Sequence, residues 1–253
     1  IFRSPIEEIV SLKSFIKYVK AKLIYRFHIR KFVLKKSKNS KKFINYGYVT
    51  FTNKNIHKEC IKIFKKLNDK NVAWLDNVND KISLSYNGDP SVFLKGELVN
   101  IFKSGVDKFL KEIFESDYKI IYHVLIKSNN NNSKTKPSGS MLWHSDGRRG
   151  TRINLHICHS YVSNENGAMK CLSWKDSLKV HFYTISEFTK SFALTNSSKN
   201  KISKKDLREM KVNLMAKYIR DNSINYFQPK TIKSGLIYAF RNNNIHCGGF
   251  PKV

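Results

Sequence analysis

The length, composition and charge of the chain exclude two broad classes of protein. Its 253 residues carry 47 Lys and Arg against 19 Asp and Glu, a formal net charge of +28, and 41% of them are hydrophobic. That apolar fraction is enough to bury a core, which excludes a chain that is disordered throughout. The sequence also lacks a run of about 18 uncharged apolar residues, which excludes a spanning helix.

The first 44 residues are predicted to form a basic amphipathic helix followed by a polar linker. Apolar residues between Ile6 and Phe27 recur at helical spacing, and Lys and Arg fill much of the remainder. Such a helix docks on an acidic membrane surface or packs on the main domain with its basic face in solvent. We favour packing. Residues 35–42, rich in Lys and Ser, are predicted to be the linker.

Residues 45–253 are predicted to form one domain in which helices precede strands. We expect a strand at 46–51, a helix at 55–67 and a helical stretch at 92–114 interrupted at Gly96 and Gly105. Further strands are expected at 119–127, 141–146, 151–158, 231–232, 236–240 and 245–247, with a polar loop at 129–140, a helical insert near 175–230 and a helix at 204–220. This pattern indicates a mainly β protein with flanking helices (α+β), folded as a β-sandwich or jelly roll.

The spacing of the four cysteines indicates the cellular compartment in which the protein works. Cys60, Cys158, Cys171 and Cys247 lie far apart, and none forms a Cys-x-x-Cys pair, which argues against a zinc ribbon or a redox dithiol. In a chain of this length they are typical of reduced thiols, so we expect a cytoplasmic protein.

The charge of +28 has two interpretations. It is typical of proteins that bind nucleic acid or an anionic membrane. It also follows from compositional drift, because the chain is rich in Lys, Asn and Ile, with Asn runs at 129–132 and 242–244 that AT-rich coding would produce. Lys is spread along the whole chain instead of clustering with aromatic residues, so we favour drift.

The sequence His144-Ser145-Asp146 is the first candidate metal motif. Residues two apart on a strand project to the same face, so this spacing directs an imidazole and a carboxylate to one point. A second imidazole from a distant strand would complete a 2-His-1-carboxylate face, which leaves positions open and suits non-haem Fe(II). About 100 residues later, a predicted strand and a short turn lead to His246, followed by Gly248 and Gly249. Cys247 is expected to point away from His246 and to pack in the core.

Four segments, taken together, carry a resemblance to a known family. They are Tyr46 to Phe51 with the helix after it, Trp143 to Asp146, the Asn-Glu-Asn-Gly-Ala-Met-Lys stretch at 164–170, and Gly235 to Gly249. In their order and spacing, over residues 45–253, the chain resembles Fe(II)/2-oxoglutarate-dependent dioxygenases of the phytanoyl-CoA dioxygenase type. The resemblance implies a double-stranded β-helix (jelly roll, cupin-like). It also implies Fe(II) and 2-oxoglutarate as cofactors, and His144, Asp146 and His246 as iron ligands.

The resemblance leaves one cofactor contact open. The family binds the far carboxylate of 2-oxoglutarate with an Arg that follows the distal histidine, but this sequence ends seven residues after His246. We expect the sequence, which runs from Ile1 to Val253, to be a fragment truncated at both ends. If another cation takes this role, Arg152 is the internal candidate, because it shares a strand face with Asn154 and His156 and offers a bidentate guanidinium. The alternatives are an exposed turn cation for Arg152 and a core histidine for His156.

The resemblance to this family implies that the protein uses dioxygen to hydroxylate a C–H bond of a small substrate. The basic surface suits an anionic substrate, although drift explains the charge equally well. Two other classes stay open. One is a non-enzymatic basic jelly-roll module that binds nucleic acid or an acidic membrane surface, to which residues 1–44 would contribute peripheral contact. The other is a catalytically inactive member of the family.

Overall fold

The computed structural model describes residues 36–69, 72–76, 83–121, 123–128, 141–146, 152–163, 165, 167–196, 203–230 and 233–249. The predictions for the helix within residues 1–35, the loop at 129–140 and the strand at 231–232 lie outside these ranges.

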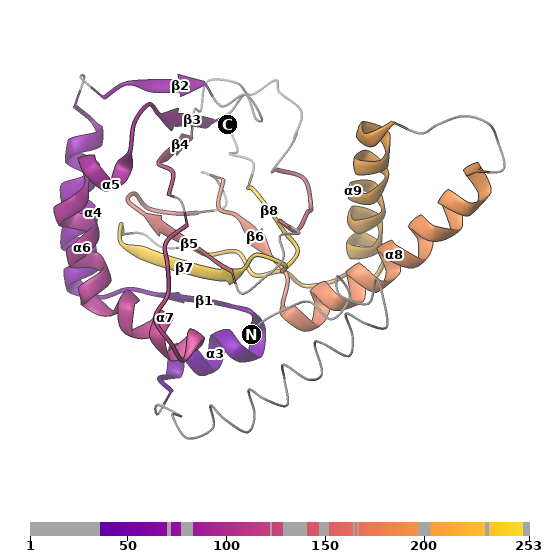
Figure 1. Cartoon of the computed structure of the whole chain (residues 1–253), viewed down its shortest axis with the longest axis horizontal. Helices are drawn as coiled ribbons and strands as arrows, with labels where there is room; N and C mark the ends of the chain where they lie inside the picture. The colour runs from indigo at the N-terminus through magenta and orange to yellow at the C-terminus, as the bar shows by residue number, and fades with distance from the viewer. Residues whose placement is uncertain are drawn as a thin grey trace.

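The described residues form a mixed helix-and-sheet protein (Figure 1). The helices are α3 (Lys38–Tyr46), α4 (Lys54–Leu67), α5 (Pro90–Phe93), α6 (Lys95–Ile101), the π-helical turn η2 (Phe102–Val106), α7 (Asp107–Phe114), α8 (Trp174–Asn196) and α9 (Lys204–Asp221). The strands are β1 (Tyr48–Phe51), β2 (Trp74–Asp76), β3 (Ser83–Tyr86), β4 (Ile126–Ser128), β5 (Ile153–Cys158), β6 (Lys170–Cys171), β7 (Leu236–Arg241) and β8 (His246–Cys247). Helices hold more of these residues than strands do, so the prediction of a mainly β protein is wrong for the described part of the chain.

All strand pairs are antiparallel in the described sheets, which have the orders β1-β7-β5, β2-β3-β4 and β6-β8. The central strand β7 is buried on both faces. Ile237 and Ala239 face the helices, whereas Tyr238 and Phe240 pack with Cys171 of β6. β7 therefore lies between a helical layer and the β6-β8 pair that carries His246.

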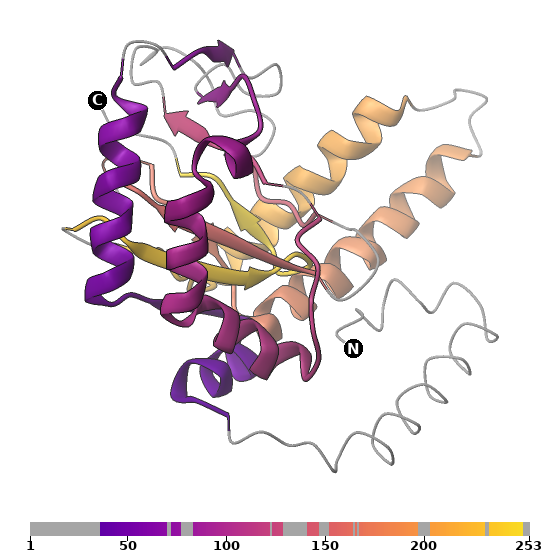
Figure 2. The ribbon, with the colours of Figure 1, turned by 60° about the vertical axis from the view of Figure 1, so that its left-hand side comes forward.

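The main core fills the space between the β1-β7-β5 sheet and helices α3, α4, α6 and α7. Helices α4 and α6 lie side by side across one face of this sheet (Figure 2). Val49, Ile63 and Ile237 have no exposed surface, and Phe109 packs edge-on against the ring of Phe43. Burial of this apolar surface provides the main stabilisation of the scaffold that supports β7.

Helix α3 replaces the polar linker that was predicted at residues 35–42. Ser37 caps its N-terminus, and Phe43 is fully buried. The buried carboxylate of Glu112 in α7 accepts hydrogen bonds from Ser37 N at 2.9 Å and from Ser40 Oγ at 2.5 Å. The linker prediction was based on local polarity. Here two serines serve as a helix cap and as partners for a buried carboxylate.

Two of the expected strands are shorter than predicted. Of the described residues within 119–127, only Ile126 and Lys127 belong to a strand, β4, and within 141–146 there is a single β-bridge at His144. A β-branched composition favours extended backbone but does not provide a hydrogen-bonding partner, and Ile121 and Val124 remain exposed. The helical stretch at 92–114 deviates from helical geometry at Gly105, as expected, but not at Gly96, which lies within α6.

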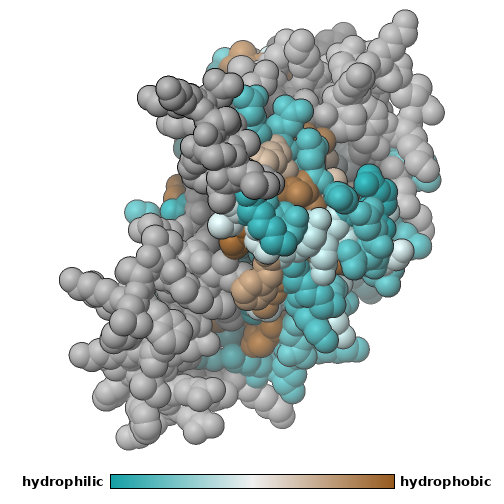
Figure 3. Space-filling view, turned by 90° about the vertical axis from the view of Figure 1, so that its right-hand side faces the viewer, coloured by the Kyte–Doolittle hydropathy of each residue, from teal (hydrophilic) through white to brown (hydrophobic). Residues whose placement is uncertain are grey.

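Helices α8 and α9 form a hairpin that extends from one side of the molecule (Figure 1). Val180, Met215 and Ile219 of the hairpin pack with Leu172 and Ile245, next to β6 and β8. Figure 3 views the molecule from the right-hand side of Figure 1, toward which the α8-α9 hairpin extends. On this face, the surface of the described residues is mostly hydrophilic, with a narrow hydrophobic strip near its centre. None of the helices in the described ranges has both the length and the apolar content that a membrane crossing requires.

Candidate metal centre

A short antiparallel pairing brings His144 and His246 together. The backbone N–H of each donates to the carbonyl of the other at 2.9 Å. Two residues after His144, Asp146 N donates to the carbonyl of Asn242 at 3.0 Å. Residues opposite one another in such a pairing, and residues two apart on one strand, project to the same side. The backbone therefore directs all three side chains to one point.

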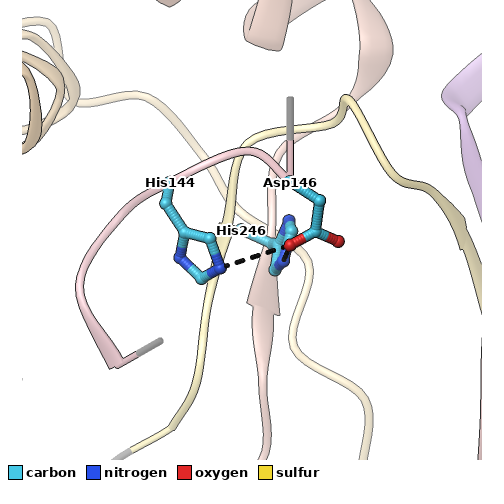
Figure 4. A group of neighbouring side chains, drawn as sticks. All are labelled: His144, Asp146 and His246. Atoms are coloured by element: carbon cyan, nitrogen blue, oxygen red, sulfur yellow. Dashed lines mark ion pairs between the residues drawn. The ribbon is translucent and has the colours of Figure 1, made fainter. Parts of the chain in front are cut away.

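The three side chains predicted as metal ligands form one compact group (Figure 4). The candidate ligand atoms of His144, Asp146 and His246 all lie within 4.8 Å of one another. Asp146 Oδ1 is 3.7 Å from His144 Nε2 and 3.8 Å from His246 Nε2. Donor atoms that share a metal ion at about 2.0–2.2 Å lie roughly 3–4 Å apart. These two separations therefore fit a shared ion.

Hydrogen bonds to backbone carbonyls fix the tautomer of both imidazoles. His144 Nδ1 lies 2.7 Å from the carbonyl oxygen of Leu142, and His246 Nδ1 lies 2.8 Å from that of Asn244. A carbonyl oxygen only accepts, so each Nδ1 carries the proton and each Nε2 presents a lone pair. This arrangement is typical of metal-binding histidines, and the donor set fits a divalent metal of the non-haem iron type.

The site is buried at His246 and more open at Asp146. The side chain of His246 is 6% exposed and that of Asp146 is 34% exposed. Burial lowers the pKa of His246 to about 4, and the neighbouring His144 acts in the same direction. His246 is therefore neutral at physiological pH, which is the form that binds a metal.

The three residues predicted to contact the cofactor lie at or next to β5. Asn154 Nδ2 donates to Asp146 Oδ2 at 2.5 Å. His156 is exposed, and its ring packs edge-on against Phe240, with the ring centroids 5.2 Å apart. Arg152 directly precedes β5, and its carbonyl accepts a hydrogen bond from Asn242 N at 3.4 Å.

The turn formed by Asn242, Asn243 and Asn244 supports the site, although a run of Asn in this composition favours drift. They are only 3%, 5% and 0% exposed. The carbonyl of Asn242 accepts a hydrogen bond from Asp146 N, that of Asn243 from His181 Nε2 at 3.1 Å, and that of Asn244 from His246 Nδ1. The end of the run two residues before the predicted ligand His246 was the one available signal of this role.

Close packing holds this turn and the neighbouring segment in place. Asn244 Nδ2 donates to the carbonyl of Leu172 at 3.0 Å, and Gly47 sits against the same amide. A Cβ added to Gly249 would lie 2.2 Å from the carbonyl oxygen of Ala168. Each glycine therefore allows an approach that a side chain would block.

The four cysteines are free thiols. Cys247, beside His246, is 5% exposed, and burial raises its pKa to about 12. It is not part of the His-Asp-His group within the described ranges, and its burial agrees with the expected core position.

No family model and no curated protein matches the sequence, but solved structures do. The non-heme alpha ketoglutarate dependent carbocyclase SnoK from nogalamycin biosynthesis gives a TM-score of 0.51 at 10% identity, covering 87% of this chain and 79% of that protein. HygX from Streptomyces hygroscopicus, with nickel and 2-oxoglutarate bound, gives 0.50 at 10% identity, covering 87% and 83%. At these identities the similarity shows the fold alone, and the chain shares its overall fold with both proteins.

Proposed function

We propose that the chain is a non-haem Fe(II)/2-oxoglutarate-dependent oxygenase on a double-stranded β-helix, with His144, Asp146 and His246 as the iron ligands. The observation that carries the proposal is the convergence of these three side chains, with each Nδ1 bound to a backbone carbonyl and each Nε2 presented as a donor. Two imidazoles and one carboxylate leave coordination positions open, which suits non-haem iron oxygenases. The fold shared with SnoK and HygX supports the same class.

The side chains of the site would bind and orient the iron. Fe(II) and 2-oxoglutarate would supply the oxidative dioxygen chemistry, which side chains alone do not provide. The low pKa of buried His246 keeps one ligand deprotonated, and Asp146 contributes a negative charge. Because Asp146 is more exposed than His246, we place the approach of cofactor and substrate on the Asp146 side.

Arg152 is our candidate for the cation that binds the far carboxylate of 2-oxoglutarate. Arg152 directly precedes β5, and strand alternation, if it extends by one residue, supports a position on the face that Asn154 and His156 share. A guanidinium can pair with a carboxylate through two parallel hydrogen bonds, and a buried carboxylate without a partner costs several kcal/mol. We assign His156, beside Phe240, to the same binding region. An Arg beyond Val253 is the alternative, and in a longer chain Arg152→Ala would then have little effect on 2-oxoglutarate binding.

The proposed reaction is hydroxylation of a C–H bond in a small substrate. The net charge of +28 favours an anionic substrate, because a basic surface raises the local concentration of anions. The phytanoyl-CoA dioxygenase type and the cytoplasmic location remain predictions from the sequence.

Anaerobic titration tests the proposal. The wild-type protein should bind one Fe(II), and adding 2-oxoglutarate should produce a visible charge-transfer band. Removing a hydrogen-bond partner of a metal ligand lowers metal affinity by roughly 10–100-fold. His246→Ala removes a proposed ligand itself, so it should lower Fe(II) affinity by more than that. His123→Ala is the matched control, because His123 Nε2 also pairs with a carboxylate, that of Asp89 at 2.7 Å, outside the candidate site. It should bind Fe(II) like the wild type.

Two results would contradict parts of this proposal. Iron binding without a band on adding 2-oxoglutarate would remove the cofactor and leave a metal-binding protein. Absence of iron binding, together with steeply salt-dependent binding to nucleic acid, would favour the basic binding module, because counterion release makes such binding depend on salt.

A further inference from the structure

Each of the three candidate ligands has its own orienting hydrogen bond, but these bonds differ in origin. Backbone carbonyls, those of Leu142 and Asn244, orient the two imidazoles. The carboxylate of Asp146 is held by a side chain, the amide of Asn154. A substitution can remove this third bond without changing the backbone.

The two oxygens of Asp146 have different surroundings. Asn154 Nδ2 donates to Oδ2 at 2.5 Å, whereas Oδ1 lies 3.7 and 3.8 Å from the two imidazole Nε2 atoms. Rotation about the last side-chain bond of an Asp is soft, so an unrestrained carboxylate would exchange its oxygens or present both. The bond from Asn154 opposes this rotation and leaves Oδ1 directed at the group.

Asn154 is well placed for this task. It lies on β5 opposite Phe240 of the central strand β7, so its backbone is held by a regular sheet. Asp146 lies in a segment with a single described β-bridge, at His144. The amide thus ties the ligand on the less regular segment to the most regular part of the scaffold.

We propose that Asn154 is a positioning residue that holds Asp146 as a one-oxygen ligand, and that it thereby sets the metal affinity and the number of positions left open at the metal. The inference rests on the proposed function. It assigns the Asn154 amide to a ligand carboxylate, in place of the cofactor contact expected from the sequence. A two-oxygen carboxylate would take up a position that 2-oxoglutarate or dioxygen needs.

The test compares Asn154→Leu with Asn100→Leu. Leu has the same branching and the same number of side-chain heavy atoms as Asn, although it is bulkier, and it has no donor. Asn100 Nδ2 donates to a carboxylate oxygen of Glu59 at 3.2 Å, so the control removes the same kind of bond between helices α6 and α4. Should Asn154→Leu fail to fold, Asn154→Ala removes the same donor without adding bulk.

The measurements use metal-free protein with Mn(II), whose free concentration is followed by its electron paramagnetic resonance signal. Co(II) is used for visible spectra and circular dichroism for thermal stability. Asn154→Leu should weaken Mn(II) binding by about 10–100-fold, as for other outer partners of metal ligands, and should change the Co(II) spectrum because Oδ2 is released. Asn100→Leu should leave metal affinity within about twofold of the wild type, since distant sites act independently.

The outcomes separate this inference from the proposed function. The positioning role is overturned if the wild-type protein binds Mn(II) and Co(II) and the Asn154→Leu variant has the same metal affinity and the same Co(II) spectrum. The proposal of a metal centre would still hold in that case. Equal losses in the Asn154 and Asn100 variants overturn it too, because they would reflect general destabilisation. Wild-type protein that binds neither Mn(II) nor Fe(II) overturns both proposals.

Discussion

Replacing Gly47 by Ala should destabilise the protein through its contact with Asn244. Gly47 has a φ of +77°, and an added Cβ would lie 2.6 Å from Asn244 Nδ2 and 2.7 Å from Asn244 Oδ1. The left-handed conformation costs an alanine about 1–2 kcal/mol. Displacing the amide breaks its bond to Leu172 and leaves buried polar groups unpaired, which costs about 1–3 kcal/mol. The free energy of unfolding should therefore fall by about 2–5 kcal/mol.

A double-mutant cycle isolates the contact from the backbone strain. Asn244→Ala by itself loses the same bond to Leu172. In the double variant the new Cβ no longer meets an amide, so Gly47→Ala adds only its conformational strain. The double variant should be more stable than the sum of the single effects predicts, by the roughly 1–3 kcal/mol that would otherwise be counted twice.

Gly105 provides the matched control. Its φ is +134°, but the nearest atom to an added Cβ is Asn53 Nδ2 at 4.0 Å, so Gly105→Ala introduces strain without a clash. Urea unfolding followed by circular dichroism and fluorescence gives the free energies. Gly105→Ala and Asn244→Ala should add within about 0.5 kcal/mol. The reasoning fails if the Gly47 and Asn244 effects also add within that margin.

Three further outcomes follow from buried groups elsewhere. Burial raises the pKa of Glu112, but hydrogen bonds from two serines outweigh this effect, so the pKa in the folded protein is lowered overall. The ionised carboxylate therefore stabilises the fold, and this stability should be lost as the pH falls below about 4.3, the ordinary pKa of Glu, and through the lower pKa of the folded protein. Unfolding in urea at pH 7 and pH 3 should show a smaller loss in Glu112→Gln, and an equal loss would refute this account. Gly249→Ala, whose Cβ would meet the backbone of Ala168, should lower the melting temperature, whereas Gly96→Ala, with nothing within 4 Å, should keep or raise it. A melting temperature unchanged by Gly249→Ala would contradict the close approach. Burial raises the pKa of four thiols to about 11 or 12, those of Cys60, Cys158, Cys171 and Cys247. A disulfide reagent at pH 8 should therefore react slowly with the folded chain, because the thiolate is the reactive form. In urea, where the chain is unfolded, the reagent should react with all four cysteines.

The parts of the fold that were predictable have a strong local pattern. Helices α4 and α9 begin and end within a residue of their expected bounds, and β5 and β7 lie where alternating or apolar residues placed them. The meeting of His144, Asp146 and His246 was also anticipated. Alternation placed His144 and Asp146 on one face, whereas the family resemblance implied His246 as the partner from the distant segment. Local periodicity thus accounts for the helices, the strands and the first two residues of the group.

Features that depend on distant partners were not predictable in the same way. The serines at the start of α3 are typical of a linker until Glu112 is placed beside them. The described residues of 119–125 have strand composition but form no strand, and their link to β3 is the hydrogen bond from Tyr86 N to the carbonyl of Leu125. In both cases a distant contact, or its absence, decides the structure, and local composition does not record it.

The turn at Asn242, Asn243 and Asn244 shows a deeper limit. Its three contacts with the site or its surroundings are made by backbone carbonyls, and every residue type has one. The side chains therefore carry no signal of that role, and a run of Asn is equally compatible with drift and with function. Asn244 also makes specific side-chain contacts, because its amide packs against Gly47 and bonds to Leu172. Its requirement for Asn becomes visible only when these distant segments are brought together. The cycle with Gly47 therefore tests a position in the turn where the identity of the side chain should matter.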